Sequence, residues 1–325
     1  MINFIRNDFY RISTRKYYIL ISVLMTMISI VLGVYLTSNL QTKANIAIVS
    51  KSTTSSFQSK YANVTLLDKE PEKYELVLSK YDGVIIDKGN GKYAVDTIKN
   101  EDYRKTLEMV LKNPKDFKPE NKDSRGIGTT IIGYLLMFIL LQGVLFMFTL
   151  AEDIELKQIE RIASAPISFI KYLLSNFIFN FFIVFLPAFL ILAVMKDIFG
   201  YNIGFSLVEY AGLLGIIVSF GIAFAMFINS IVKVSDIANM MGSSIVVLTT
   251  ILAGSFYSFE NGNKILEKAI WILPQKDFLS FVQGLENGKN IITIIPQLSY
   301  VIVISLVFFI FSIIKIKKDY VLRKD

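Results

Sequence analysis

The most informative ionisable residues of this chain lie in one short segment, 151–168, which contains Glu152, Asp153, Glu155, Glu160 and Arg161. The chain has neither cysteine nor histidine, which excludes thiol chemistry, disulfides, imidazole catalysis and the commonest zinc sites. Any hydrolytic or redox reaction would have to use carboxylates, Lys, Tyr or Ser. These side chains converge at no single membrane depth, so we predict no catalytic residue, cofactor or metal site.

One further segment, Gly89-Asn-Gly-Lys92, has some features of a phosphate-binding loop. Tyr93 stands where such a loop needs Ser or Thr, and no glycine lies at the required upstream spacing. We therefore interpret the segment as a hairpin turn. The chain is expected neither to bind nor to hydrolyse ATP by itself.

Composition identifies the solvent around these residues. Hydrophobic residues make up 53% of the 325, too many for an ordinary globular surface. The net charge of +7 comes from Lys and Arg that flank apolar runs of about 20 residues, the length that crosses a bilayer. The basic residues form no stripe interleaved with aromatics, so the partner they indicate is the lipid bilayer and not a nucleic acid.

The apolar runs predict an α-helical polytopic membrane protein with six transmembrane helices and an extracellular α/β domain inserted between the first and second. Residues 1–16 are predicted to form an interfacial amphipathic helix and residues 315–325 a cytoplasmic tail. The spans are expected at 17–36, 127–150, 169–195, 207–232, 237–256 and 291–314.

Segment 37–126 has the composition of a small α/β domain, with dense charge and turn pairs such as Asn90-Gly91. Helices are expected at Pro71–Ser79 and Glu101–Lys112. Strands are expected at Asn45–Val49, Val64–Leu67, Gly83–Ile86 and Tyr93–Thr97.

Charge also predicts orientation. An even number of spans places both termini on one side, and basic residues concentrate in the N-terminal segment, the C-terminal tail and the 151–168 connection. The positive-inside rule makes all three cytoplasmic and the 37–126 domain extracellular. We expect a multi-pass protein of a bacterial cytoplasmic membrane.

Two patterns inside the spans bear on mechanism. No Asp, Glu, Lys or Arg lies deep in a predicted span, so we find no proton or sodium relay, and the energy for any transport is expected to come from elsewhere. The fourth span has small residues at every fourth position, which would let another helix approach closely, either within the subunit or at a subunit interface. They are Ala211, Gly215, Ser219 and Ala223.

The connection after the second span is predicted to be a surface helix that ends before Pro166. Its apolar residues Ile154, Ile159 and Ile162 alternate with charged ones at helical spacing. The helix either lies on the lipid headgroups or receives a soluble partner, and we favour the second interpretation.

This segment resembles a cytoplasmic stretch that is typical of the membrane subunits of type-2 ABC exporters, the ABC-2 transporter permease family. Lys157 and Gln158 replace the Gly-Thr pair of that stretch. The residues that match it are Glu155, Ile159, Glu160, Arg161, Ile162, Pro166, Ile167 and Ser168. The layout is also similar, with Ile46–Val49 and Tyr81–Ile86 in the external domain and short external helices at Asn263–Leu273 and Asp277–Leu285 within 257–290.

The resemblance implies a permease subunit that moves an amphipathic, peptidic or lipid-like substrate, using ATP hydrolysed by a separate cytoplasmic ATPase. It also implies a second permease copy, either identical or paralogous. Coupling to the ATPase would use Glu155, Ile159, Glu160, Arg161 and Ile162.

Two other classes remain as alternatives. One is a membrane-anchored receptor or envelope scaffold that binds a partner through its extracellular domain, and the other is a membrane enzyme. Co-purification with an ATPase would favour transport, and activity of the chain alone would favour an enzyme.

Overall fold

The computed structural model divides the chain into two compact units. A helical unit contains Met1–Leu36 and Arg125–Asp325, and a smaller unit, Thr37–Ser124, is inserted after the first long helix. The structure describes residues 2–39, 44–49, 62–67, 69, 71, 81, 83–87, 93–97, 104, 107, 125–164, 168–256, 268 and 270–321.

The helical unit contains six described helices that are long and apolar enough to cross a membrane, and these confirm the predicted polytopic helical fold. Two π-helical turns, η1 (Val194–Ile198) and η2 (Lys317–Val321), extend the third and sixth spans. The spans are α2 (Lys16–Asn39), α5 (Ile127–Phe146) continued by α6 (Phe148–Glu155), α8 (Phe169–Ala193), α9 (Leu207–Ile231), α10 (Ser235–Leu252) and α13 (Ile291–Ile316).

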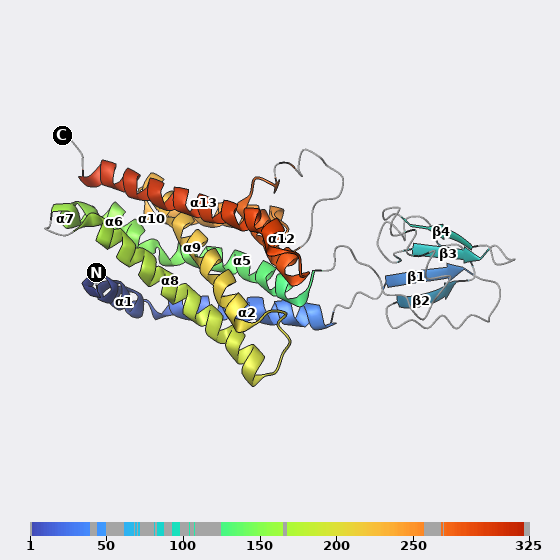
Figure 1. Ribbon diagram of the computed structural model, residues 1–325. Helices are drawn as coiled ribbons and strands as arrows, with labels where there is room; N and C mark the ends of the chain where they lie inside the picture. The colour runs from blue at the N-terminus through green and yellow to red at the C-terminus, as the bar shows by residue number, and fades with distance from the viewer. Residues whose placement is uncertain are drawn as a thin grey trace. The chain divides into compact units, whose positions relative to one another are not determined.

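Helices α5 and α9 form the centre of this unit (Figure 1). In the most apolar 18-residue window of each span, 72% of the residues are buried for α5 and 67% for α9. The value for α13 is 17%, so α13 presents most of its surface outward. The start of α9 is fixed locally. The Ser206 hydroxyl accepts a hydrogen bond from the Glu209 backbone N–H at 3.3 Å, and the Glu209 carboxylate accepts one from Ser206 N at 2.8 Å, which is a capping box.

The second span is interrupted where the sequence predicts a single run. A turn at Met147 separates α5 from α6. Buried amides support this turn, because Asn229 Nδ2 donates to the Met147 carbonyl at 3.3 Å and Asn180 Nδ2 lies 3.3 Å from the Met147 sulfur. Polar side chains from α8 and α9 therefore satisfy groups that lipid could not.

The inserted unit contains a four-stranded sheet, ordered β2-β1-β3-β4. Its strands are β1 (Ala44–Val49), β2 (Ala62–Leu67), β3 (Gly83–Asp87) and β4 (Tyr93–Asp96), close to the predicted ones. β1 pairs in parallel with β2 and β3, and β3 pairs antiparallel with β4.

Side chains of this unit bury Ala47 and Val84 against Tyr81. Most of the two predicted helices, and the predicted turn at Asn90-Gly91, lie outside the described residues, although Arg104 and Leu107 are helical. The side of the membrane on which this unit lies stays a prediction.

The segment before the last span contains α12 (Pro274–Glu286), which covers the second predicted short helix. Most of the first, Asn263–Leu273, lies outside the described residues. α12 packs against α5 and α13 and begins with Pro274 at its first position, where the missing N–H has no helical partner to lose.

Candidate functional site

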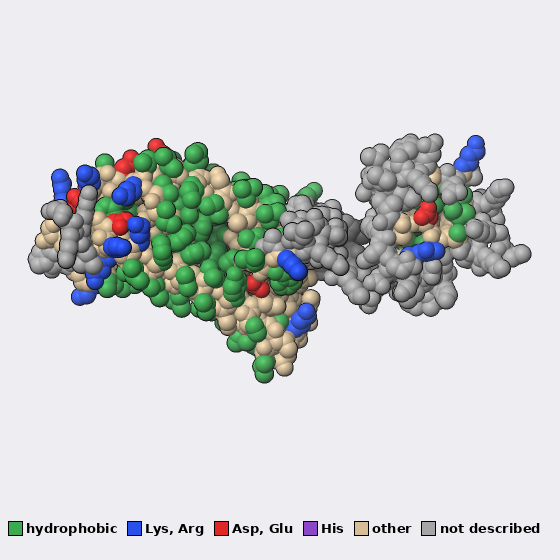
Figure 2. Space-filling model, turned by 90° about the horizontal axis from the view of Figure 1, so that it is seen from above, with side chains coloured by type: hydrophobic (Ala, Val, Ile, Leu, Met, Phe, Trp, Pro, Cys, Tyr) green, Lys and Arg blue, Asp and Glu red, His purple; other side chains and the backbone are tan. Residues whose placement is uncertain are grey.

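One end of the helical unit gathers α1 (Ile2–Thr14), α6, α7 (Gln158–Ser164) and the end of α13 (Figure 1). Lys and Arg side chains concentrate at this end, whereas apolar side chains cover the middle of the face shown (Figure 2). This end contains the described residues, 151–164, of the segment for which the sequence predicts partner binding.

Helix α1 is attached to the end of the second span by ion pairs. Arg11 contacts Asp153 at 2.9 Å and Glu152 at 3.0 Å, and Arg15 contacts Glu152 at 2.6 Å. Asp153 is only 3% exposed and also accepts a hydrogen bond from the Tyr172 hydroxyl on α8. The basic residues that the sequence offers as a topology signal thus also join three helices.

A further carboxylate, that of Asp8 on α1, is buried beside these ion pairs. Asp8 is 2% exposed, and its Oδ2 accepts no hydrogen bond from a described residue. Burial raises the pKa of the Asp8 carboxyl to about 7, while Arg11 lowers this pKa and Asp153 raises it. The Asp8 carboxyl therefore titrates near neutral pH.

The predicted single surface helix is two helices in the structure. α6 ends at Glu155, the chain turns at Leu156 and Lys157, where Lys157 has a φ of 54°, and α7 begins at Gln158. Glu155 consequently does not continue the surface of α7. Its Oε2 accepts a hydrogen bond from Ser235 N at 3.0 Å, which places it at the first turn of α10.

The apolar face of α7 is covered by this chain, and coupling of Ile159 and Ile162 to an ATPase stays a prediction. Ile159 is 0% exposed, and Ile162 packs half-buried against the core of the helical unit. The amphipathic pattern is real, but the chain's own helices use it. Glu160 is half-buried, Arg161 is exposed, and Pro166 and Ile167 lie outside the described residues.

A polar hollow of about 530 Å³ lies between α1, α7 and α8. Asn3, Asn7 and Gln158 contribute amides that can both donate and accept hydrogen bonds. The other lining residues are Phe4, Asp153, Ile162 and Tyr172. Nowhere in the described ranges do three Asp or Glu side chains lie together so that they could hold a metal ion.

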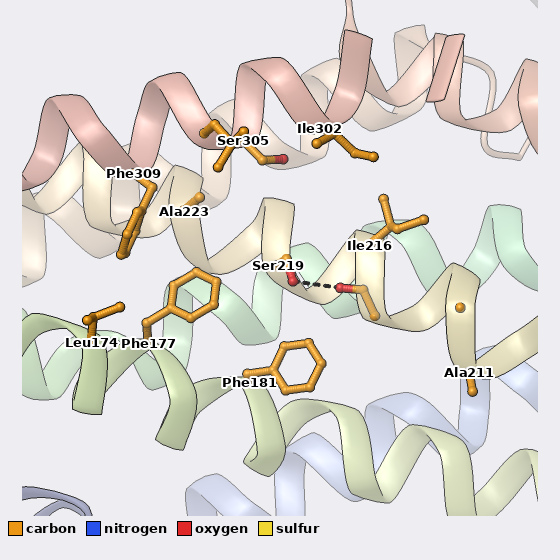
Figure 3. Close-up of a pocket in the computed structure, with 13 residues that line it drawn as sticks. Leu174, Phe177, Phe181, Ala211, Ile216, Ser219, Ala223, Ile302, Ser305 and Phe309 are labelled. Carbon is orange, nitrogen blue, oxygen red and sulfur yellow. Dashed lines mark hydrogen bonds between the residues drawn. The ribbon is translucent and has the colours of Figure 1, made fainter. Parts of the chain in front are cut away.

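The small-residue stripe of α9 lines one wall of an apolar groove of about 600 Å³ between α8, α9 and α13 (Figure 3). Ala223 is buried at one end of the stripe, but at Gly215 a Cβ atom would have no described atom within 4 Å. Gly215 therefore has no close neighbour among the described residues, and the role of the stripe in helix packing stays a prediction. A subunit interface at the stripe stays a prediction.

Comparison with known protein families gives a match over most of the chain. The sequence model of the ABC-2 family transporter proteins matches residues 16–314, which include the first five described spans, most of the sixth and the inserted unit. The chain belongs to this family. No curated protein and no solved structure matches it.

Membership of the ABC-2 transporter family makes the chain a multi-pass permease of the ABC transporter type, which is a transport membrane subunit and not itself the catalyst. It implies association with an ABC ATPase. Glu155, at the end of α6, and Glu160 and Arg161, on α7, lie in the segment of this permease for which the sequence predicts a partner.

Sequence reasoning missed several polar residues inside the permease. Gln142 on α5 donates to Thr26 Oγ1 at 2.9 Å and accepts from the Ser22 hydroxyl at 2.8 Å, which joins α2 to the centre. Single Gln and Asn residues within the apolar runs were the available signal, because an uncharged amide in a span also needs a partner.

Proposed function

We propose that this permease is the membrane subunit of an ATP-binding cassette exporter, which moves an amphipathic, peptidic or lipid-like substrate outward with ATP hydrolysed by a separate cytoplasmic ATPase. The observation that supports this most is the family match, which spans residues 16–314. The described spans also hold no cluster of acidic residues at mid-membrane that would serve an ion-driven pump.

On this proposal, the ATPase docks on the solvent-exposed side of α7, beside α1. The residues that contact it are Glu160 and Arg161, since the apolar face of α7 is already buried. Ile159 and Ile162 then hold α7 in place. Coupling follows two connections. One is the hydrogen bond from Ser235 N to Glu155, which reaches α10, and the other is the pair of Arg11 ion pairs that join α1 to the second span.

Two copies, or this chain with a paralogous permease, enclose the translocation path. In support, the centre of the single unit is filled. Ile131, Leu135 and Ile139 of α5 are each 0% exposed against the surrounding helices. A path for a large amphipathic substrate therefore fits better between two such units than through one.

The docking proposal is tested by charge reversal at Arg161, with Lys289→Glu as the control. Both side chains are exposed, and Lys289 precedes α13, outside the α1–α7 cluster. Arg161→Glu should weaken the complex with the co-expressed ATPase by about 2 kcal/mol, roughly 30-fold, and lower substrate-stimulated ATP hydrolysis. Native affinity and native hydrolysis for Arg161→Glu would remove the support for docking at α7.

The same experiment distinguishes the alternative function. If no ATPase binds the native chain at all, a receptor or envelope scaffold that acts through the inserted unit becomes the better account. Binding that Lys289→Glu preserves and Arg161→Glu impairs is expected only for a transporter that docks its ATPase at α7.

Orientation is tested in a chain that has no native cysteine. Lys69→Cys in the inserted unit should react with an impermeant thiol reagent added to intact cells, because we propose that this unit is extracellular. Gln158→Cys should react only after permeabilisation. Both native side chains are exposed, so a lack of reaction reports the membrane side and not burial.

A further inference from the structure

Three buried oxygen atoms on α6 and α8 have no hydrogen-bond partner among the described residues. They are Thr149 Oγ1 on α6 and the amide oxygens Oδ1 of Asn176 and Asn180 on α8, and all three side chains are 0% exposed. A polar atom that is buried without a partner is costly, and such atoms commonly bind an ordered ligand. We propose that these three atoms bind one water molecule between α6 and α8. The proposal concerns the interior of the helical unit and does not depend on an ATPase.

The helical repeat brings the three atoms to facing surfaces. Tyr172, Asn176 and Asn180 follow one another at intervals of four residues, so they share one face of α8. On α6, Thr149 lies one turn before Asp153 on the same face. The Tyr172 hydroxyl donates to the Asp153 carboxylate, which fixes how the two helices are aligned. Because consecutive spans run in opposite directions, Thr149 lies opposite Asn176, one turn beyond this hydrogen bond (Figure 1).

A second contact supports the same alignment. Asn180 Nδ2 lies 3.3 Å from the sulfur of Met147, at the break between α5 and α6. Met147 precedes Thr149 by two residues, and Asn180 follows Asn176 by one turn. The three unpaired oxygens are therefore bounded on both sides by contacts between the second and third spans.

The orientation of each amide is fixed by α8 itself. Asn176 Nδ2 donates to the Tyr172 carbonyl at 3.3 Å, and Asn180 Nδ2 donates to the Asn176 carbonyl at 2.8 Å. Exchanging oxygen and nitrogen in either amide would place two oxygens against each other, so both Oδ1 atoms stay available as acceptors. They cannot satisfy one another, because neither carries a hydrogen.

One water molecule matches this set of groups. It donates one hydrogen bond to each Asn oxygen and accepts one from the Thr149 hydroxyl, which gives it three partners, as buried waters typically have. Cβ atoms one helical turn apart are about 5–6 Å apart, and a water that bonds two acceptors at about 2.8 Å each spans nearly that distance. The spacing of Asn176 and Asn180 therefore suits a single bridging water.

The polar hollow provides a path to this site. Asp153 and Tyr172 line the hollow, and each lies one turn away from Thr149 or Asn176 on the same helix face. Water that enters the hollow has one helical turn of protein to pass and no hydrocarbon to cross. The site is thus the inner end of a polar strip that begins between α1 and α7.

A monovalent cation fits the site less well than water. None of the three unpaired atoms belongs to a carboxylate. Arg11 donates to the Thr149 carbonyl at 3.2 Å, so a positive charge already lies beside the site. A bound cation would be repelled by this guanidinium, whereas a neutral water is not.

Hydroxyl-radical footprinting of the full-length chain in nanodiscs tests the proposal, because X-ray radiolysis converts a bound water into a radical that oxidises its neighbours. Met147 is the internal reporter, since its sulfur contacts Asn180 and its side chain is 0% exposed. Met226 on α9 is also 0% exposed and is the control. Met147 should form its sulfoxide at least about threefold faster than Met226. Equally slow oxidation of the two methionines overturns the proposal, and this comparison requires no variant.

Two variants assign the signal to the site. Thr149→Val keeps the shape of the side chain and removes the hydroxyl, and Asn176→Leu removes one acceptor. Each should lower the oxidation of Met147 to the rate of Met226. Ser312→Ala is the matched control, because this buried hydroxyl donates to the Phe308 carbonyl of its own helix at 2.6 Å, and it should leave Met147 unchanged. Fast oxidation of Met147 in both variants would overturn the assignment to these atoms.

A bound cation is the other outcome, and salt composition detects it. The melting temperature of the native chain should be the same in sodium chloride, potassium chloride and N-methylglucamine chloride at equal ionic strength, because the proposed ligand is neutral. A melting temperature that rises with sodium or potassium in the native chain but not in Thr149→Val would assign the three oxygens to a cation and overturn the water site.

Discussion

The carboxylate of Glu286, at the end of α12, caps the first turn of α5, with Oε1 2.7 Å from the backbone nitrogen of Gly128. Its second oxygen, Oε2, accepts a hydrogen bond from Thr129 N at 2.8 Å. The first N–H groups of a helix have no partner within the helix and carry partial positive charge. A side chain 158 positions away therefore satisfies the start of the most buried span.

Replacing Glu286 with Ala should lower the free energy of unfolding by about 2 kcal/mol, because two charge-assisted hydrogen bonds to a helix start are lost. Glu286→Gln should retain part of this stability. Thermal unfolding of the purified chain in detergent measures the change. Asp236→Asn, an exposed acidic residue in the first turn of α10, is the control and should have little effect. Similar melting for Glu286→Ala and the control would show that the cap contributes nothing.

The glycines beneath this cap should not tolerate a side chain. A Cβ on Gly128 would collide with the ring of Phe205, and a Cβ on Gly204, whose φ is +86°, would collide with Gly128 N. Gly128→Ala should therefore cost about 1–3 kcal/mol, and Gly204→Ala at least as much. Gly212→Ala faces open space in the middle of a helix and should instead stabilise by about 0.5–1 kcal/mol. Equal melting temperatures for the three variants would contradict this explanation.

The spans and the strands were readable from the sequence because each depends on its own residues. A run of about 20 apolar residues crosses a bilayer whatever its neighbours are, and Ser206 with Glu209 marks the start of α9 locally. The family match agrees with the resemblance found in segment 155–168.

Relationships between distant residues were not readable. The amphipathic pattern of α7 shows that Ile159 needs cover, but it does not say whether a partner or the chain itself provides it. The same holds for Glu286 and Gly128, whose pairing depends on how α12 returns to α5. The stripe on α9 permits close approach of a helix from the same subunit or from another, but the pattern does not say which, and among the described residues Gly215 has open space at its Cβ position.

The stability of the permease should depend on pH through Asp8. The carboxyl titrates near 3.8 when exposed and near 7 in the folded chain, so between these values the folded chain holds a proton that the unfolded chain has released. Stability from this group is complete below pH 3.8 and is lost as the pH rises to about 7. The groups that face Asp8 are Arg11 on α1, Asp153 on α6 and Tyr172 on α8.

Asp8→Asn should remove this dependence. At about pH 8 the variant should be more stable than the native chain, by an amount on the order of 3 kcal/mol, whereas at about pH 4 the two should match. Hydrogen exchange of α1 and thermal unfolding measured across this range report the difference. Asp236→Asn should leave the native pH profile unchanged. A native profile that is flat from pH 4 to about 8 would contradict the buried, proton-binding state of Asp8.

The ion pairs of α1 should differ in strength according to burial. Arg11 has a side chain 21% exposed and pairs with Asp153, whose side chain is 4% exposed, whereas Arg15 is 37% exposed and pairs with the more accessible Glu152. Arg11→Met should cost about 3–5 kcal/mol, because it leaves a carboxylate buried without its cation. Arg15→Met should cost about 1 kcal/mol or less, because water replaces the lost partner.

Adding Asp153→Asn to Arg11→Met should recover much of the loss, since the uncompensated charge is then gone and the Tyr172 hydroxyl still finds an acceptor. Thermal unfolding of the native chain, Arg11→Met, Asp153→Asn and the double variant measures this cycle, and proteolysis at α1 is a local readout. Additive losses in the double variant would mean that Arg11 and Asp153 contribute separately and that α1 is held by its apolar residues alone.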